Sequence, residues 1–297
     1  MRARNWPQYN KYLVQRGSLT FLIDPKVMKT LVPKDKKSRG RPLEFSNQFI
    51  EMLLMIKIHF RLPYRQLEGF ARSLLEQMKL PAKMPTYSLI CKRAKQLAFC
   101  LPKLSTRQPT TVIVDASGIK VQGEGEWKVK VHGKGRPRKW IKIHVAIDAK
   151  TQEIVGEITT EASVDDGKAF PDLMNQVPNR VNTVLGDGAY DDKDVREIIK
   201  QRGGRALIPP PKNAVCHGTD LDRDHAVLAI RAFGGDKTAK SIWGKLTGYS
   251  QRALVETTFS RYKKIFGDRF FSRTKDRQKV ESRLKCLILN KMMRAAA

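Results

Sequence analysis

Two aspartates follow apolar, β-branched runs in a way that could bring them together. Asp115 comes directly after residues 111–114, and Asp187 follows residues 181–186. If the two runs are neighbouring strands of one sheet, both carboxylates lie at the same edge, where each raises the pKa of the other unless a cation separates them. Mg²⁺ prefers a few carboxylates together with phosphate oxygens, and two such ions can catalyse in-line phosphoryl displacement. The two aspartates therefore predict a metal site that a third acid would complete.

A helix predicted over residues 250–266 supplies the third acid. At about 100° per residue, Tyr249, Arg252, Glu256 and Lys263 share one face of this helix, roughly 60° wide. An adjacent arc carries the apolar side chains, which are Leu254, Val255, Phe259, Tyr262, Ile265 and Phe266. A glutamate between an arginine and a lysine usually forms a surface ion pair. A row of charges beside a buried arc, after two strand-terminal acids, favours a functional site instead, with Glu256 as its third carboxylate.

The segment after residue 110 has the pattern of an α/β domain. Alternating apolar residues and β-branched runs predict strands, whereas apolar residues at helical spacing predict helices. The predicted strands cover residues 111–115, 139–148, 153–160, 181–187 and 205–208, and the predicted helices cover 166–177, 192–201, 250–266 and 275–293. Three strands, helix, strand, helix, strand, helix is the order of an RNase H-like domain with a mixed five-stranded sheet. We expect this domain over residues 110–297, with an irregular insertion at about 209–248.

Residues 1–109 are predicted to form a separate all-α domain. The helices predicted from apolar spacing and from breaks at proline cover residues 46–61, 63–78 and 87–99. The last helix carries Lys92, Arg93 and Lys95. This arrangement predicts a helix-turn-helix domain that places a basic helix in the major groove of DNA. A plain three-helix bundle with a charged face is the alternative.

The charge of the chain indicates a polyanionic partner, in the first place nucleic acid. The 297 residues include 57 Lys and Arg but 29 Asp and Glu, which gives a net charge of +28. Residues 1–109 hold 22 basic and 6 acidic residues, residues 110–248 hold 22 and 19, and residues 249–297 hold 13 and 4. The carboxylates are thus concentrated in the middle segment. This favours an enzyme that holds metal ions beside phosphates over a structural nucleic-acid binder.

A membrane partner is not expected. The most apolar helical run, Phe49 to Phe60, contains Glu51, Lys57 and His59 and is too short to span a bilayer. The first ten residues precede no apolar stretch, so they do not resemble a signal peptide. The four cysteines form no CxxC pair, which predicts a reduced cytoplasmic protein with free thiols.

Two basic loops are further candidates for DNA contacts. Arg39 and Arg41 lie in an Arg-Gly-Arg-Pro run that is similar to the core of an AT-hook, in which extended arginines enter a narrow minor groove. A solvated linker is the alternative for this run. Arg136 and Arg138 lie in a second basic loop, which we expect to follow the DNA backbone.

These residues together resemble those of bacterial insertion-sequence transposases of the DDE class. The spacing Tyr249-x2-Arg252-x3-Glu256-x6-Lys263 matches the Y-R-E-K signature of one branch of that family. Asp115 in Val-Asp-Ala-Ser-Gly and Asp187 in Gly-Asp-Gly-Ala-Tyr-Asp resemble its first and second aspartates. The resemblance covers roughly residues 35–295. Asp115, Asp187 and Glu256 are called the triad below.

The resemblance implies a DNA transposase. The triad would bind two Mg²⁺ (or Mn²⁺) ions, Arg252 and Lys263 would contact phosphates of the transposon end, and Tyr249 would support the same site. Water would cleave the phosphodiester at the element terminus, and the freed 3′-hydroxyl would attack target DNA. The implied setting is the bacterial cytoplasm at the nucleoid.

The implied partners are double-stranded DNA, at both the transposon ends and the target, and a second copy of the chain. Two ends joined to one target need two active sites, and a two-fold symmetric dimer provides them. The apolar helix from Phe49 to Phe60 is a candidate for the dimer interface. A buried core helix is the alternative for this segment.

Two other functions fit the same residues. A nuclease of the same fold would cleave DNA without strand transfer, and a DNA-binding relic would not cleave at all. The complete triad disfavours the relic. Trp243 could stack on an extruded base, but a packing role is favoured.

The remaining acids and His144 are expected to have structural roles. The acids predicted to be helix caps rather than ligands are Asp165, Asp166, Asp191 and Asp192. Asp148 is predicted to lie in a turn, and His144 to have a structural role in its strand.

Overall fold

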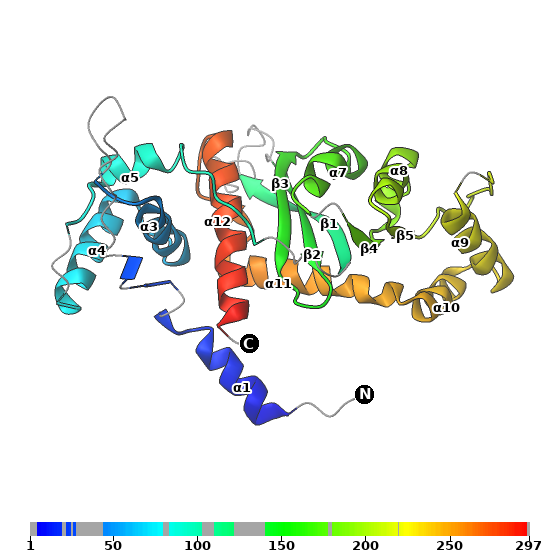
Figure 1. The fold of residues 1–297 in the computed structure, drawn as a ribbon, viewed down its shortest axis with the longest axis horizontal. Coiled ribbons are helices and arrows are strands. Elements are labelled where there is room, and N and C mark those ends of the chain that lie inside the picture. Colours follow the sequence, from blue (N-terminus) through cyan, green and yellow to red (C-terminus); the bar gives the residue numbers. More distant parts are fainter. Residues whose placement is uncertain are drawn as a thin grey trace, which may run out of the picture. The chain divides into compact units, whose positions relative to one another are not determined.

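The computed structural model describes residues 5–19, 22–24, 26–27, 44–79, 83–102, 110–121, 140–177, 180–218 and 220–295. The chain divides into two compact units (Figure 1). The helical unit consists of residues 1–100 and 272–297, and the sheet unit consists of residues 101–271.

A mixed sheet forms the centre of the sheet unit. Its strands are β1 (Thr110–Val121), β2 (Trp140–Asp148), β3 (Ile154–Glu161), β4 (Val181–Leu185), β5 (Arg205–Leu207) and β6 (Arg269–Phe270). The first five lie in the order β3-β2-β1-β4-β5, and β6 pairs with β1. β1, β2 and β3 are antiparallel neighbours, whereas β4 is parallel to β1 and β5 is parallel to β4. The predicted RNase H-like order is confirmed, and β6 adds a sixth, two-residue strand.

β1 is longer than the sequence predicts, so Asp115 lies within the strand rather than at its end. On one edge, β1 pairs with β2 along nearly its whole length. On the other edge it pairs with β4 as far as Ile113 and with β6 from Lys120. Ile113 is level with Leu185, the last residue of β4, so Asp115 and Asp187 lie at matching positions two residues further along. The two aspartates meet where β4 ends.

Helices position the rest of the sheet unit around this point. α7 (Asp166–Met174) packs against β2 and β3, and α8 (Lys193–Gln201) packs against β5. The core between these helices and the sheet includes Val112 and Val114. Because side chains alternate along a strand, Asp115 points away from this core. Its carboxylate contacts the turn that precedes α11 (Ala253–Phe266), the helix that packs against β1.

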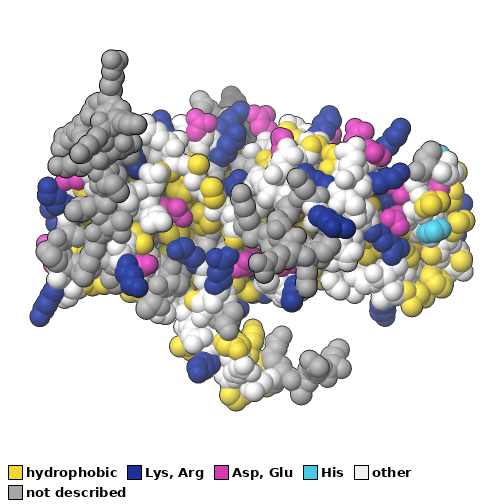
Figure 2. All heavy atoms as spheres, in the orientation of Figure 1, with side chains coloured by type: hydrophobic (Ala, Val, Ile, Leu, Met, Phe, Trp, Pro, Cys, Tyr) yellow, Lys and Arg dark blue, Asp and Glu magenta, His cyan; other side chains and the backbone are white. Residues whose placement is uncertain are grey.

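The segment between β5 and α11 is helical, which corrects the irregular insertion expected at about 209–248. It contains α9 (Leu221–Ala232) and α10 (Lys237–Thr247). Each helix begins with an aspartate cap, because Asp220 and Asp236 accept hydrogen bonds from backbone N–H groups three residues on. Large apolar side chains stay exposed over these helices, at Leu221, Leu228, Phe233, Ile242 and Leu246 (Figure 2). The pair therefore presents an apolar surface to solvent beside its packed side.

The helical unit contains α1 (Trp6–Gln15), α3 (Asn47–His59), α4 (Tyr64–Gln77), α5 (Tyr87–Arg93) and α12 (Lys275–Arg294). α12 packs against α3, so the C-terminal helix belongs to this unit. The division differs in this respect from the expected boundary between residues 109 and 110, which assigned residues 272–297 to the catalytic domain. α12 carries a buried ion pair between Lys285 and Glu281, 2.9 Å apart, and buries apolar side chains such as Leu284 and Ile288.

α3 is a core helix. Phe49, Ile50, Leu53 and Ile56 are at most 2% exposed within the single chain. These side chains are therefore not available to a second copy, which contradicts the dimer interface considered for this segment. Among the described residues, none of the helices combines the length and the apolar composition that crossing a bilayer requires.

Candidate active site

The guanidinium of Arg252 binds all three carboxylates of the triad. Its Nη2 lies 3.3 Å from Oδ2 of Asp115 and 3.8 Å from Oδ2 of Asp187. Its Nη1 donates a hydrogen bond of 2.6 Å to Oε1 of Glu256. The structure therefore brings together the three acids that the sequence predicts as one site, from β1, the end of β4 and α11.

Local backbone contacts orient the two aspartates. Oδ1 of Asp115 accepts a hydrogen bond of 2.9 Å from the N–H of Ala116. Asp187 caps the 3₁₀ turn η2 (Gly188–Tyr190), because its Oδ1 accepts a hydrogen bond of 3.0 Å from the N–H of Ala189. Each aspartate thus keeps Oδ2 for the cation at the centre. Glu256 lies in the first turn of α11.

Burial raises the pKa of Asp115 above its ordinary value, and the negative charges of Asp187 and Glu256 raise it further. Arg252 opposes this shift by favouring the ionised carboxylate. The same carboxylates raise the pKa of Arg252, although burial lowers it. The site therefore keeps three acids close together because a cation lies among them.

Tyr249 and Arg252 lie on the 3₁₀ turn η3 (Tyr249–Arg252) rather than on the α-helix predicted from residue 250. The turn follows Gly248, whose φ of +80° requires the left-handed conformation that glycine adopts readily. The ring of Tyr249 lies 5.3 Å from that of Trp243 on α10, centroid to centroid. Trp243 is 4% exposed, so the packing role favoured for it is observed. Burial raises the pKa of Tyr249 to about 12.

Lys263 lies in the last turn of α11 and is half-buried. Lys263 lies seven positions after Glu256, which is about two helical turns, so both residues lie on the same side of the helix. Lys263 could therefore extend the charged row of Arg252 and Glu256 along α11, as the sequence predicts.

The triad suits a divalent cation, although the structure carries a guanidinium in that position. Within the described residues, no group of three or more His, Cys, Asp or Glu side chains lies close enough together to hold a metal ion. The carboxylates nevertheless converge on one cationic group, and oxygen ligands of this kind are those that Mg²⁺ and Mn²⁺ prefer. Arg252 would have to withdraw from them for metal ions to bind.

The predicted DNA contacts of the basic helix are only partly accessible. Lys92 and Lys95 are exposed. Arg93 is 6% exposed, donates a hydrogen bond of 3.3 Å to the carbonyl of Phe45, and hydrogen-bonds Oδ1 of Asn47. Arg93 therefore has a structural role, which contradicts its assignment to DNA. α5 also ends at Arg93, six residues earlier than predicted, and Lys95 lies beyond it.

The other predicted DNA contacts, Arg39, Arg41, Arg136 and Arg138, lie outside the described residues.

Asp148 and His144 have the structural roles expected of them, whereas Asp191 does not have the role of a helix cap. Asp148 accepts hydrogen bonds from Thr110, Lys150 and Thr151, as expected for a turn. His144 is buried, and burial lowers its pKa to about 4. Asp191 is different, because its carboxylate binds two arginines in the interior instead of capping a helix. Its position before α8 predicts only a cap, and its distant partner Arg223 could not be identified from spacing.

Comparison with known families gives a match over most of the chain. Residues 106–291 match a family model described as "Transposase DDE domain", and residues 14–124 match a second model with the same description. An uncharacterized protein of Aquifex aeolicus (strain VF5) is 27% identical over 236 residues. The aligned region covers 70% of this chain and 66% of that relative.

Among solved structures, the chain is similar to a piggyBac transposase in a synaptic complex with hairpin DNA. The TM-score is 0.43 at 11% identity, over 95% of this chain and 74% of that one. It is also similar to a Mos1 transposase in a paired-end complex with the left transposon end, with a TM-score of 0.23 at 13% identity, over 58% of this chain and 61% of that one.

Proposed function

The chain belongs to the transposase DDE family, and on this premise we propose that it cleaves the ends of an insertion sequence and joins them to target DNA. The observation that carries the proposal is the convergence of the triad on Arg252. Three carboxylates around one positive charge would become ligands of hard divalent cations once Arg252 withdraws and the side chains close around the metal ions. A fold that needed these acids only for stability would have little reason to gather them around one partly exposed point.

The triad would hold two Mg²⁺ or Mn²⁺ ions, which when bound polarise the scissile phosphodiester and activate water for in-line attack. Oδ2 of each aspartate is the oxygen that faces the central cation, since Oδ1 is engaged by the backbone. Arg252, once released from the carboxylates, and Lys263 would bind phosphates of the transposon end. Tyr249, held by Trp243, would support Arg252 from the start of the same 3₁₀ turn.

Recognition of the inverted repeats is proposed for the helical unit. Lys92 and Lys95 are exposed cations at and beyond the end of α5, and exposed cations can contact phosphates and release counterions. The acting form is proposed to be a dimer on double-stranded DNA, because two ends must be joined to one target. The buried face of α3 has no part in that interface.

The proposed function is tested by strand transfer. Full-length protein would be incubated with Mg²⁺, a target plasmid and a labelled, pre-cleaved DNA end taken from the sequence that flanks its coding region. We expect covalent joining of the labelled 3′ end to the plasmid, and joining should stop with EDTA and with a 3′-dideoxy end.

Each alternative gives a different result in this experiment. Cleavage of uncut ends without joining of pre-cut ends identifies a nuclease of the same fold. Binding of the ends without cleavage or joining identifies a non-catalytic DNA-binding protein. Either result contradicts the transposase proposal.

A further inference from the structure

We propose that Asp191 is a positioning residue that fixes the loop carrying Asp187 relative to the segment that delivers Arg252 and Glu256. The proposal rests on the proposed function, since it treats Asp187 and Glu256 as ligands of one metal site. Asp191 does not contact the central cation. It would act by holding in place two backbone segments, the loop that carries Asp187 and the segment that carries Arg252 and Glu256.

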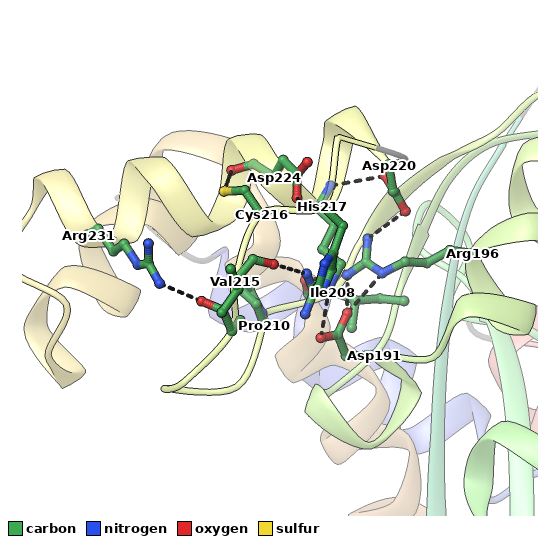
Figure 3. A network of polar contacts seen from close by, with 12 residues as sticks. Asp191, Arg196, Ile208, Pro210, Val215, Cys216, His217, Asp220, Asp224 and Arg231 are labelled. Atoms are coloured by element: carbon green, nitrogen blue, oxygen red, sulfur yellow. Dashed lines mark hydrogen bonds and ion pairs between the residues drawn. The ribbon is translucent and has the colours of Figure 1, made fainter.

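Asp191 binds two arginines from two different helices. Its Oδ1 accepts hydrogen bonds from Arg196 of α8, of 2.9 Å from Nε and 2.6 Å from Nη2 (Figure 3). Its Oδ2 accepts a hydrogen bond of 3.3 Å from Nε of Arg223 of α9. The side chain of Asp191 is 4% exposed, and that of Arg196 is 5% exposed. A buried charge is tolerated only with its partners in place, so this carboxylate holds the two helices together.

The same arginines extend the network to the segment that leads into α9. Arg196 donates a hydrogen bond of 3.2 Å to the carbonyl of Ile208, and its Nη1 lies 3.6 Å from Oδ2 of Asp220. Arg223 donates a hydrogen bond of 2.8 Å to the carbonyl of Val215. Through these two arginines, the carboxylate of Asp191 is connected to the residue after β5, to the loop before α9 and to the start of α9.

The loop that carries Asp187 ends at this network. Asp187 caps η2, and Tyr190 at the end of that turn is fully buried in the core. Asp191 follows directly, so the network holds the loop four residues after Asp187. The side chain of Asp187 is itself 37% exposed, and its orientation therefore depends on how firmly the loop is held.

The network is also connected to Arg252 and Glu256, through the part of the chain that begins with α9. α9 is followed by α10, Gly248 and η3, and Arg252 ends that turn. Trp243 on α10 contacts Tyr249, which connects α10 to the turn. The exposed apolar surface of α9 and α10 does not anchor them. The network at Asp191, together with the hydrogen bonds that Asp224 accepts from the loop before α9, therefore sets where α9 begins, and with it the course of the chain towards Arg252 and Glu256.

A second aspartate that pairs with an arginine, on α9, provides a matched control for Asp191. Asp222 of α9 pairs with Arg205 of β5 at 3.1 Å, but the two side chains are 36% and 55% exposed. This pair also ties α9 to the sheet, and it forms no hydrogen bond or ion pair with Asp191 or with residues 187–190. A difference between the two aspartates therefore reports on positioning, because both changes remove one carboxylate that binds an arginine.

The experiment compares Asp191→Asn with Asp222→Asn in the full-length chain. The amide introduced by Asp191→Asn would keep one acceptor for Arg196, but it would present N–H₂ to one arginine and carry no charge. Mn²⁺ alone is titrated without DNA, and single-turnover cleavage is measured beside DNA affinity. We expect Asp191→Asn to weaken Mn²⁺ binding and slow cleavage by about 10-fold or more, in the range seen for outer-shell residues. DNA affinity should stay within about twofold, and Asp222→Asn should match wild type.

A milder variant covers the case in which Asp191→Asn does not fold. Arg223→Gln leaves the pair of Asp191 and Arg196 intact and removes only the direct link from Asp191 to α9, so a smaller loss of Mn²⁺ affinity is expected. A folded Asp191→Asn or Arg223→Gln protein that binds Mn²⁺ and cleaves as wild type does overturns the proposal.

Amide hydrogen exchange separates this proposal from the proposed function. Positioning by Asp191 predicts faster exchange at residues 188–191 in Asp191→Asn than in Asp222→Asn, with or without metal. Wild-type protein that binds no Mn²⁺ and cleaves no DNA overturns the proposed function alone. Unchanged exchange at these amides overturns the positioning role.

Discussion

Arg252 is the residue on which the electrostatics of the candidate site depend. Asp115, Asp187 and Glu256 would repel one another without a positive charge between them, and this repulsion adds to burial, the main cause of the raised pKa of Asp115. The guanidinium relieves the repulsion through three contacts. A divalent cation would relieve it in the same way, so Arg252 and metal ions are expected to compete for the same oxygens.

This competition predicts the behaviour of Arg252→Gln. Without metal, the variant should lose about 1 kcal/mol of stability, which lowers the Tm by about 2–4 °C in a domain of this size. Added Mg²⁺ should restore more of the Tm in the variant than it adds to wild type. Thermal unfolding in EDTA and in Mg²⁺ measures both effects. An equal response to Mg²⁺ in the two proteins would show that Arg252 does not occupy the metal position.

Removal of any carboxylate of the triad should stop catalysis without weakening DNA binding. Asp115→Ala, Asp187→Ala and Glu256→Ala are each expected to slow cleavage by more than about 100-fold, the upper limit for outer-shell residues. DNA affinity should persist, because a lost negative charge does not weaken phosphate contacts. Labelled transposon ends report cleavage, and a gel-shift titration reports binding. Asp165→Ala is the control, since that side chain is 75% exposed. Wild-type cleavage by any triad variant removes that residue from the site.

At the scale of elements, the basic residues at the end of α5 differ in exposure, and we expect them to differ in role. Lys92 and Lys95 are exposed, whereas Arg93 points into the helical unit. The double variant Lys92→Ala/Lys95→Ala should weaken DNA binding and reduce the slope of log affinity against log salt by about one for each phosphate that it no longer neutralises. Its Tm should stay within a few degrees of wild type. Binding titrations at several salt concentrations test this expectation, and an unchanged slope would exclude α5 from the DNA surface.

Arg93→Ala is expected to act on stability instead. It leaves the buried carbonyl of Phe45 without its donor, at a cost of about 1–3 kcal/mol. Denaturant unfolding measures the loss, and DNA affinity per folded molecule should stay at the wild-type value. A stable Arg93→Ala protein with weak DNA binding would restore the role that the sequence suggested for this arginine.

The sequence predicts helices and strands well where the spacing of the apolar residues matches the face that the fold buries. Most of the apolar arc predicted for α11 is buried, because a helical period determines the buried face, although two of its residues, Leu254 and Ile265, are only partly buried. β1 extends past Asp115 because β2 pairs with it through Lys120, and strand pairing outweighs the weak strand preference of Ser117 and Gly118.

Other elements and contacts depend on partners that local spacing does not reveal. The glycine, proline and aspartate residues of segment 209–248 predict irregular structure, so α9 and α10 are not predicted from the sequence. The N-cap residues Asp220 and Asp236 could have indicated where these helices begin. The amphipathic pattern of α12 gives its buried face but not the unit that it joins. Asp191 meets Arg223 from 32 positions away, so its ion pairs follow from the tertiary fold alone.

For the whole molecule, the separation of the chain into two compact units makes a division of labour between protomers possible. The proposed DNA-end contacts lie in the helical unit, and the triad lies in the sheet unit. In the proposed two-fold dimer, the end bound by one helical unit would be cut by the triad of the partner subunit, which would keep either protomer from cutting before both ends are assembled. The charge of +28 allows both units to contact DNA at once.

Mixing two inactive proteins tests this arrangement. One carries Asp187→Ala, and the other carries Lys92→Ala/Lys95→Ala and therefore keeps Arg93 and the fold of its helical unit. Cleavage in trans predicts that the mixture recovers activity that neither protein shows alone, because the mixed dimer holds one intact DNA-binding unit and one intact triad on different protomers. Cleavage in cis predicts no recovery, because each protomer then lacks one of the two parts. The mass of the DNA complex is measured in parallel, and a monomeric mass without recovery would rule out the dimer.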